Sequence, residues 1–251
     1  MKDRYASLKE GLVGAWIPSV SGSGFLLPDV SGRNNHGTLT NMAADDWVSS
    51  PSGRCLDIDA TNDLINCGSN TSAMLNGKSA MSCACWFTKL GSGGGGFGRI
   101  FEFGNSSRTF LYDGTVLNLL GTGGGVNVQL STAISNGLRF YAFVVVLGVS
   151  VNIYVDGENV PLSLVTLGGG TFIFSTNNLI LCNREDAQRA MGGLLHEIRL
   201  YDRALSASEI RILAQRPGIG LTTQRRTAYY APPSFNAGRL RRQQLIGSGV
   251  Y

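Results

Sequence analysis

Short runs of alternating apolar and polar residues, separated by glycine-rich stretches, extend through most of this 251-residue chain. Residues 149–155 alternate clearly, and Asp156-Gly157 follows them as a signal for a hairpin turn. Residues 81–89 are apolar on both faces, which is typical of a central strand that is covered on both sides. Glycine-rich stretches at 91–96, 121–125 and 168–170 are typical of turns and loops. The pattern therefore predicts a protein built mainly from β-strands.

The alternation predicts strands at 12–17, 36–40, 54–59, 64–67, 81–89, 99–103, 109–113, 115–120, 126–130, 138–147, 149–155, 171–174, 178–182 and 193–201. One helix signal follows them. Ser206 and Glu209 form a capping box ahead of an apolar run, and Pro217-Gly218 is a stop signal. Many strands closed by a single short helix indicate an all-β, antiparallel β-sandwich, because parallel α/β folds need alternating helices.

The charge distribution divides the chain into three parts. The net charge is +4, yet residues 217–251 alone carry five arginines and no acidic residue, so the remainder is close to neutral. This last segment also contains Pro232-Pro233 and too few clustered apolar residues to form a core of its own. We therefore predict a lead segment at 1–10, a sandwich domain at 11–216 and a basic extended C-terminal arm at 217–251.

The sequence favours synthesis in a reducing compartment. The first ten residues are charged and are followed by no apolar stretch of the kind a secretory signal needs. The longest apolar run, 141–147, is far shorter than the ~20 residues that cross a bilayer. The five cysteines are odd in number and mostly lie in predicted strands, so we expect buried thiols. These features predict a chain made in the cytoplasm, without a signal peptide or a membrane partner.

Three phrases of the sequence resemble a known family. They are Gly11-Leu-Val-Gly-Ala-Trp16 with Asp29-Val-Ser-Gly-Arg-Asn-Asn-His-Gly-Thr38, then Ile153-Tyr-Val-Asp-Gly157, then Gly193-Leu-Leu-His-Glu-Ile-Arg-Leu-Tyr-Asp-Arg-Ala-Leu-Ser-Ala-Ser-Glu-Ile210. In this order they resemble the laminin G-like, concanavalin A-like jelly rolls, over roughly residues 11–216. The resemblance implies a jelly-roll sandwich. In the third phrase we expect Ile198 and Leu200 to face inward and Arg199 and Tyr201 outward.

The arm carries a second resemblance. Pro233-Ser-Phe-Asn-Ala-Gly and Leu245-Ile-Gly-Ser-Gly-Val-Tyr resemble C-terminal extensions of bacteriophage and prophage virion proteins. This implies other virion proteins, such as capsid or tail subunits, as partners. Arginines interleaved with Pro, Tyr and Phe favour carboxylates of a partner protein over nucleic acid, which would suit a sustained Lys/Arg block. The predicted anchoring residues are Arg225, Arg226, Tyr229, Tyr230, Phe235, Arg239, Arg241 and Arg242.

The acidic residues do not predict catalysis. Some jelly rolls of this kind are glycoside hydrolases, which need two carboxylates flanking the sugar bond. Glu185 and Asp186 are adjacent, so a strand would place them on opposite faces, and Glu197 stands alone. We therefore predict a protein that is not an enzyme, and a glycoside hydrolase with an unfamiliar carboxylate arrangement remains an alternative.

The candidates for metal and glycan binding each have a structural alternative. The resemblance implies that a structural Ca²⁺ is possible, with Asp29 as the nominated ligand and Asp202 second, but Asp29 equally suits capping of its turn. His36 would brace the same turn, and His196 would be a hydrogen-bonded, half-buried side chain. For a glycan the candidates are the aromatic residues Trp47, Tyr112 and Tyr154, which could instead pack in the core.

The leading hypothesis is a non-enzymatic structural protein of a bacteriophage virion, either a capsid decoration or a head or tail surface protein, anchored by its C-terminal arm. We also expect a homo-oligomer. The alternative is a carbohydrate-binding lectin module for attachment to a host surface, which would need exposed aromatic side chains.

Overall fold

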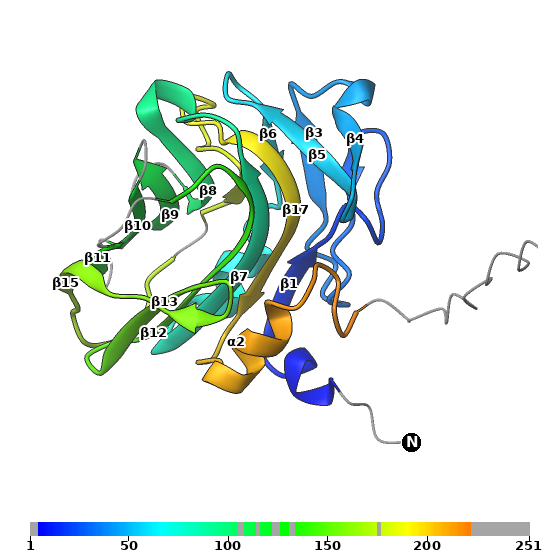
Figure 1. Cartoon of the computed structure of the whole chain (residues 1–251). Helices are drawn as coiled ribbons and strands as arrows, with labels where there is room; N and C mark the ends of the chain where they lie inside the picture. Colours follow the sequence, from blue (N-terminus) through cyan, green and yellow to red (C-terminus); the bar gives the residue numbers. More distant parts are fainter. Residues whose placement is uncertain are drawn as a thin grey trace, which may run out of the picture. The chain divides into compact units, whose positions relative to one another are not determined.

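The computed structural model describes residues 5–104, 108–113, 116–121, 126–130, 134–174 and 177–221, which form a sandwich of two antiparallel sheets (Figure 1). The strands are β1 (Leu12–Trp16), β2 (Leu26–Leu27), β3 (Gly37–Thr40), β4 (Trp47–Ser50), β5 (Gly53–Asp59), β6 (Leu64–Asn66), β7 (Ala80–Lys89), β8 (Phe97–Phe103), β9 (Arg108–Asp113), β10 (Val116–Gly121), β11 (Val126–Leu130), β12 (Gly137–Val146), β13 (Ser150–Val155), β14 (Glu158–Asn159), β15 (Leu162–Thr166), β16 (Leu179–Leu181) and β17 (Gly192–Tyr201). The helices are α1 (Asn70–Leu75) and α2 (Ala207–Leu213), with 3-10 turns η1 (Ala6–Lys9), η2 (Ala44–Asp46) and η3 (Gly94–Gly96).

The two sheets are made from strands that are far apart in the sequence. Sheet A has the order β14-β13-β12-β7-β17-β5-β4, and β1 also pairs with β17. Sheet B has the order β15-β11-β10-β9-β8-β16-β6-β3-β2. Every strand pair in the described residues is antiparallel, as the sequence analysis predicts.

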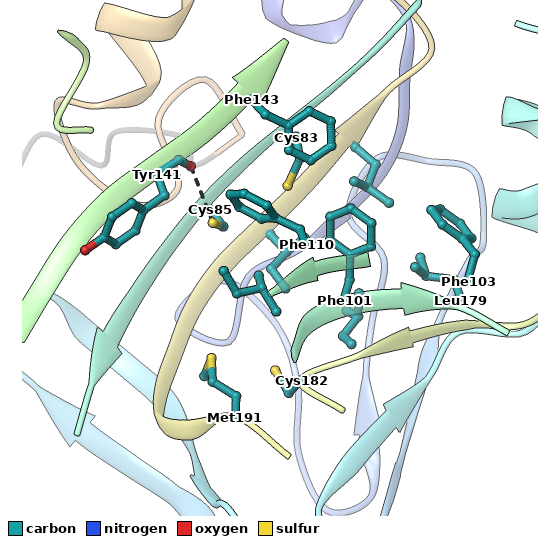
Figure 2. Close-up of a cluster of buried hydrophobic side chains, with 14 of the residues drawn as sticks. Cys83, Cys85, Phe101, Phe103, Phe110, Tyr141, Phe143, Leu179, Cys182 and Met191 are labelled. Carbon is teal, nitrogen blue, oxygen red and sulfur yellow. Dashed lines mark hydrogen bonds between the residues drawn. The ribbon is translucent and has the colours of Figure 1, made fainter. Parts of the chain in front are cut away.

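The main core lies between the two sheets and is rich in aromatic residues. Phe110 of sheet B meets Phe143 of sheet A edge to face at 5.1 Å between ring centroids, and Phe101 lies 6.0 Å from Phe143 (Figure 2). Rings that interlock in this way join the sheets directly.

All five cysteines are buried free thiols, which confirms the prediction, and burial raises the pKa of Cys67, Cys85 and Cys182.

A second apolar cluster covers the outer face of sheet A, and we call it the outer cluster. Phe140, Ala142 and Val144 of β12 pack there with Leu8 of η1, and with Ile210 and Leu213 of α2. In Figure 1, η1 (blue) and α2 (orange) lie close together beside the end of β17. This cluster corrects one expectation. Arg199 and Tyr201 do point away from the main core, but both are fully buried because the outer cluster covers them.

The described body includes residues on both sides of the predicted 11–216 domain. Leu8 and Ile219 are buried in the outer cluster. Arg199 Nη2 also donates to the carbonyl of Ile219 at 2.7 Å. The body therefore includes residues 5–10 and 217–221, because both segments cover apolar surface of sheet A.

Most predicted elements form within a residue or two of their expected ends. The capping box of α2 is present, since Ser206 Oγ accepts from the Glu209 amide at 3.3 Å and the Glu209 carboxylate accepts from the Ser206 amide at 2.9 Å.

The predicted strand at 171–174 is wrong. Phe172 exchanges backbone hydrogen bonds with Gly77 and Lys78 outside any sheet, and the alternation there reflects burial of Phe172 and Phe174. None of the described helices has the length and hydropathy of a membrane span.

Candidate functional site

The outer face of sheet B is polar, in contrast to the covered outer face of sheet A. On the strands of sheet B, apolar residues such as Ile65, Phe103 and Val128 face the main core. The polar residues that neighbour them along the strands therefore face away from the core. Registration places Asn118 of β10 directly beside Gln129 of β11. The polar residues of this face are Asn66, Arg99, Glu102, Asn118, Asn127 and Gln129, and we call them the polar face.

A β-bulge brings two charged residues together on the polar face. The register of β8 against β9 shifts between Arg99 and Phe101, so Ile100 and Phe101 both face the core. Arg99 and Glu102 consequently lie on the same face, with Arg99 Nε 2.6 Å from Glu102 Oε2. Both residues are at least nine-tenths buried, and the buried Nη1 of Arg99 has no hydrogen-bond partner in the described part of the chain. The ion pair therefore holds the guanidinium in one orientation beneath this face, with one enclosed donor left unpaired.

The loop at 183–190 is attached to β8 next to Arg99. Its centre is the buried Asn183, whose Oδ1 accepts from the amides of Arg184 at 2.7 Å and Arg189 at 2.8 Å. Asn183 Nδ2 donates to the carbonyl of Asp63 at 2.9 Å. The Arg99 amide donates to the Arg189 carbonyl at 3.0 Å. One buried amide side chain therefore fixes the loop against the sheet.

The loop presents oriented charges and borders an exposed ring. Arg184 binds Asp186 through two nitrogens, and hydrogen bonding from Arg184 lowers the pKa of Asp186. The Arg189 guanidinium lies 5.2 Å from the centre of the Phe97 ring, and Phe97 is 39% exposed. Arg189 also donates to the Gly95 carbonyl at 3.2 Å, which joins this loop to the glycine-rich loop before β8.

The polar face and the loop at 183–190 carry groups that can bind a polyhydroxylated ligand. These groups are planar amides, fixed guanidinium–carboxylate pairs and a partly exposed ring. Amide and charged side chains can exchange hydrogen bonds with hydroxyls, and an aromatic ring can pack against the C–H face of a sugar. Within the described residues, no three His, Cys, Asp or Glu side chains come together in a way that could hold a metal ion.

The model of the concanavalin A-like lectin/glucanase superfamily, in its laminin G form, matches residues 59–211, more than half of the chain. The chain belongs to this superfamily. A search of curated proteins finds no match. The family membership and the two-sheet architecture confirm the concanavalin A-like fold predicted from the sequence.

Three solved structures illustrate the shared fold. Domain 4 of AbnA, a GH43 extracellular arabinanase from Geobacillus stearothermophilus solved with arabinotriose, is 20% identical with a TM-score of 0.59, over 81% of this chain and 98% of that domain. Trypanosoma rangeli sialidase is 16% identical with a TM-score of 0.56, over 81% of this chain and 33% of the sialidase. The binding domain of botulinum neurotoxin serotype D/C is 12% identical with a TM-score of 0.56, over 82% of this chain and 52% of that domain. The chain thus spans about a third of the sialidase.

Two of the three aromatic glycan candidates, Tyr112 and Tyr154, are buried inside the body. Tyr112 is fully buried, stacks with Phe87 at 6.1 Å and accepts from the Gly192 amide at 2.8 Å, and burial raises its pKa to about 12. Tyr154 is 8% exposed and belongs to the outer cluster. Both tyrosines therefore contribute packing, the alternative that the sequence left open.

Trp47 lies at the edge of sheet A and is partly buried. Arg54 lies 4.2 Å from the ring centre, and Trp47 Nε1 donates to the Gly24 carbonyl at 2.8 Å. A Cβ on Gly22 would approach a carbon of the same ring to 2.3 Å. The indole thus holds the loop before β2, and little of its surface is left for a ligand.

Asp29 and His36 brace their turn. Asp29 accepts from the amides of Ala15, Ser31 and Asn35 at 2.9–3.0 Å and from the Ser31 hydroxyl at 2.8 Å, so both its oxygens have donors. His36 Nδ1 accepts from the Asp29 amide at 3.0 Å. This geometry is that of the turn-capping alternative, and the second metal candidate, Asp202, pairs with Lys78 at 2.9 Å.

His196 is more deeply buried than the predicted half-buried side chain. Its Nδ1 lies 3.1 Å from Ser52 Oγ and its Nε2 lies 3.0 Å from Thr88 Oγ1. Only 2% of the residue is exposed, and burial lowers its pKa to about 4. A histidine that stays neutral down to this pH is a weak base, so the serine contact does not resemble an activated nucleophile.

The acidic residues weighed for catalysis each have a partner. Glu185 accepts from Asn178 at 2.9 Å, Asp186 binds Arg184, and Glu197 forms a buried ion pair with Arg199. The predicted anchoring residues Arg225, Arg226, Tyr229, Tyr230, Phe235, Arg239, Arg241 and Arg242 lie outside the described residues.

The sequence pattern does not predict the polar face. One signal was available, since Arg99 and Glu102 interrupt an aromatic strand that reads Phe97-Gly-Arg-Ile-Phe-Glu-Phe103. Charged residues inside an apolar strand need partners when buried. The bulge that places the two side chains on one face leaves no mark in the sequence pattern, however, and Asn183 is only one asparagine among many polar loop residues.

Proposed function

We propose that this protein is a non-enzymatic recognition protein on the surface of a bacteriophage virion, whose lectin-like body binds a glycan through the polar face. The observation that carries the proposal is the difference between the two outer faces. Sheet A is covered by α2, η1 and residues 217–221. Sheet B instead carries the exposed Asn127, the partly exposed Gln129 and the partly exposed Phe97, beside the buried Arg99–Glu102 pair. AbnA domain 4, which shares this fold, was solved with arabinotriose, and this supports a carbohydrate as the ligand class.

The body is suited to attachment through its chain ends. Tyr5 lies beside Gly220, because a Cβ on Gly220 would be only 3.0 Å from the Tyr5 Cβ. Both ends of the described body therefore emerge together at the outer face of sheet A. The two sheets pack through the main core, so their outer faces point away from each other. A body held at its chain ends would leave the polar face accessible. The proposal that a virion is the supporting assembly rests on the resemblance of the arm to C-terminal extensions of virion proteins.

Glycan binding is tested by retention of the full chain on immobilised bacterial surface polysaccharides and arabinan oligosaccharides. We expect at least one of these to retain the protein. Phe97→Ala and Asn127→Ala should weaken retention by about tenfold or more, since they remove an exposed ring and an exposed amide from the polar face. Ser208→Ala, an exposed residue on α2, is the matched control and should bind like the unmodified protein.

Two results would contradict the proposal. Equal retention of all variants would move the site away from the polar face, and retention on none of the glycans would remove the ligand class. Release of new reducing ends from a retained oligosaccharide would contradict the non-enzymatic part.

The virion part has a separate test. Residues 222–251 should be cleaved by trypsin in the isolated protein and protected in purified particles that contain it, because the arginines would then be covered by partner subunits. Equal protection in both states would show that the arm belongs to the fold and would favour a free lectin.

A further inference from the structure

The sheet edges in the described part of the body differ in how they are protected. The free side of β1 is covered by the segment at 29–30, because the Val30 amide donates to the Ala15 carbonyl at 2.8 Å. At the β4 edge, Trp47 and Arg54 bind the carbonyls of Gly24 and Gly22, which holds a loop against this edge. At the β14 edge, Glu158 pairs with Arg211. The β2 edge is only two residues long. Charges, short strands and covering loops are the usual means by which proteins prevent edges from pairing with other chains.

The remaining edge, β15, has none of these protections in the described part of the molecule. It is five residues long and belongs to an uncharged stretch that extends from 159 to 183. Leu164 and Val165 are 43% and 53% exposed, one on each face of the strand. The partner of Val165 in the ladder is Val128, which is fully buried in the main core. Val165 thus lies on the core-facing side and is still more than half exposed, so the core is open along this edge.

A neighbouring residue extends the apolar surface. The turn between β12 and β13 is joined to the segment after β15, because the Gly148 amide donates to the Gly168 carbonyl at 2.8 Å. The next residue, Val149, is 75% exposed. This edge therefore combines an uncharged strand with uncovered apolar side chains, which a second strand and its side chains would cover.

We propose that β15 pairs antiparallel with β15 of a second copy of this chain, with Leu164 opposite its counterpart. A twofold pairing places each residue near the same segment of the other copy, so a charged edge would repel itself. An edge with no charges avoids that repulsion, and this favours a second copy as the occupant. Sheet B would then continue across the dimer.

The pairing would place the polar faces of the two copies on the same side of the dimer. Residues directly opposite in an antiparallel pair point to the same side of the sheet, so the two polar faces would lie on the same side. A bivalent dimer could bind a repeating polysaccharide more tightly than a monomer does. This consequence rests on the proposed glycan function, whereas the pairing itself does not.

The dimer is tested by sedimentation of the full chain without any glycan. One pair of five-residue strands buries less than a standard interface of ~1,600 Å², so we expect reversible dimers with a Kd of order 10–100 µM. Leu164→Lys should give a monomer at every concentration, because it places two like charges opposite each other. Leu90→Lys, at a leucine that is 60% exposed outside this edge, should dimerise normally.

Cross-linking identifies the edge independently of the lysine variant. The five native cysteines are buried, so an introduced surface thiol would react alone. Leu164→Cys should form a disulfide-linked dimer under mild oxidation, because opposed residues in antiparallel strands have Cα atoms ~4.5–5.5 Å apart. Leu90→Cys should stay monomeric on a denaturing gel. A monomer in sedimentation, or equal cross-linking of the two variants, would overturn the proposal. Failure of glycan binding would leave it standing.

Discussion

At the scale of single residues, buried polar side chains control the loops next to the polar face. Asn183 orders the loop at 183–190 and reaches the carbonyl of Asp63, which is itself 3% exposed. Burial raises the pKa of Asp63 from its ordinary value of 3.8 to about 6, and the carboxylates of Asp59, Asp46 and Asp57 add to this increase. The charge on Asp63 is therefore unfavourable in the folded protein above this pH.

Replacement of Asp63 should change the pH dependence of stability. The folded protein holds the Asp63 proton more tightly than the unfolded chain does, so this residue lowers the free energy of unfolding as pH rises from about 4 to 6. Asp63→Asn should therefore be similar to the unmodified protein at pH 4 and more stable at pH 7.5, by about 1–3 kcal/mol. Urea unfolding at several pH values measures this difference. A stability difference that is the same at both pH values would show that the carboxyl does not titrate as inferred.

His196 should have the opposite effect in the same range. Its pKa is lowered to about 4, so the folded protein resists protonation and loses stability as pH falls from about 6.5 towards 4. In the unmodified protein the two effects partly cancel. The Asp63→Asn variant should therefore lose more stability on acidification than the unmodified protein.

At the scale of elements, Arg203 holds both end segments of the body together. Its guanidinium donates to the carbonyls of Ser7 and Glu10 at 2.6 and 2.8 Å and to Glu209 of α2 at 2.7 and 3.0 Å. Burial disfavours the charge on Glu209, but hydrogen bonds from Arg203 and Ser206 outweigh it and lower the pKa to about 2. Glu209 thus caps α2 and fixes η1 indirectly.

Glu209→Gln should destabilise the body by about 1–2 kcal/mol at neutral pH, because it removes the charged acceptor of Arg203 and weakens the capping box. The loss should shrink below pH 4, since the native carboxylate stabilises the fold above its ordinary pKa of 4.5 and less so as pH falls towards 2. Thermal unfolding measures the effect. Arg211→Ala breaks the exposed Arg211–Glu158 pair on the same helix and is the control, with no measurable change expected. An equal shift in both variants would contradict the role given to Glu209.

At the scale of the whole molecule, residues 217–221 complete the body. The buried Glu197–Arg199 pair lies outside the main core. The Gly218 amide donates to Glu197, and Arg199 donates to the Ile219 carbonyl. Ile219 also fills the outer cluster. A buried ion pair that loses its hydrogen-bond partners is strongly destabilising.

Two truncations separate the contribution of residues 217–221 from that of residues 222–251. A chain that ends at Leu221 should unfold at the same denaturant concentration as the full chain. A chain that ends at Arg216 should lose about 3 kcal/mol or more, because the buried pair is opened to water and Ile219 is removed. Chemical denaturation of the two chains measures the difference. If the shorter chain were as stable as the longer one, the segment would be dispensable for the fold.

The sequence by itself determined the local structure of this protein. Alternation placed most strands of both sheets, but not β2, β4, β14 or β15, and no signal marked α1. The Ser206–Glu209 capping box placed α2, and the phrase around Asp29 indicated a self-bonded turn, because each of these depends on residues close together in the chain. The sequence also indicated which residues prefer burial, but it did not show which of two apolar faces the main core covers. The tertiary structure therefore decides between glycan binding and packing for Tyr112 and Tyr154, and it places Arg199 under the outer cluster.

Only the tertiary structure decided what lies outside the main core. The bulge at Ile100 turns Arg99 and Glu102 to one face, and Asn183 joins a distant loop to them. Pairing of strands far apart in sequence also made β15 an edge with an uncovered Val165. These features depend on contacts between segments separated by many residues. Local periodicity carries no record of such contacts, since it reports only whether a side chain prefers water or an apolar surface.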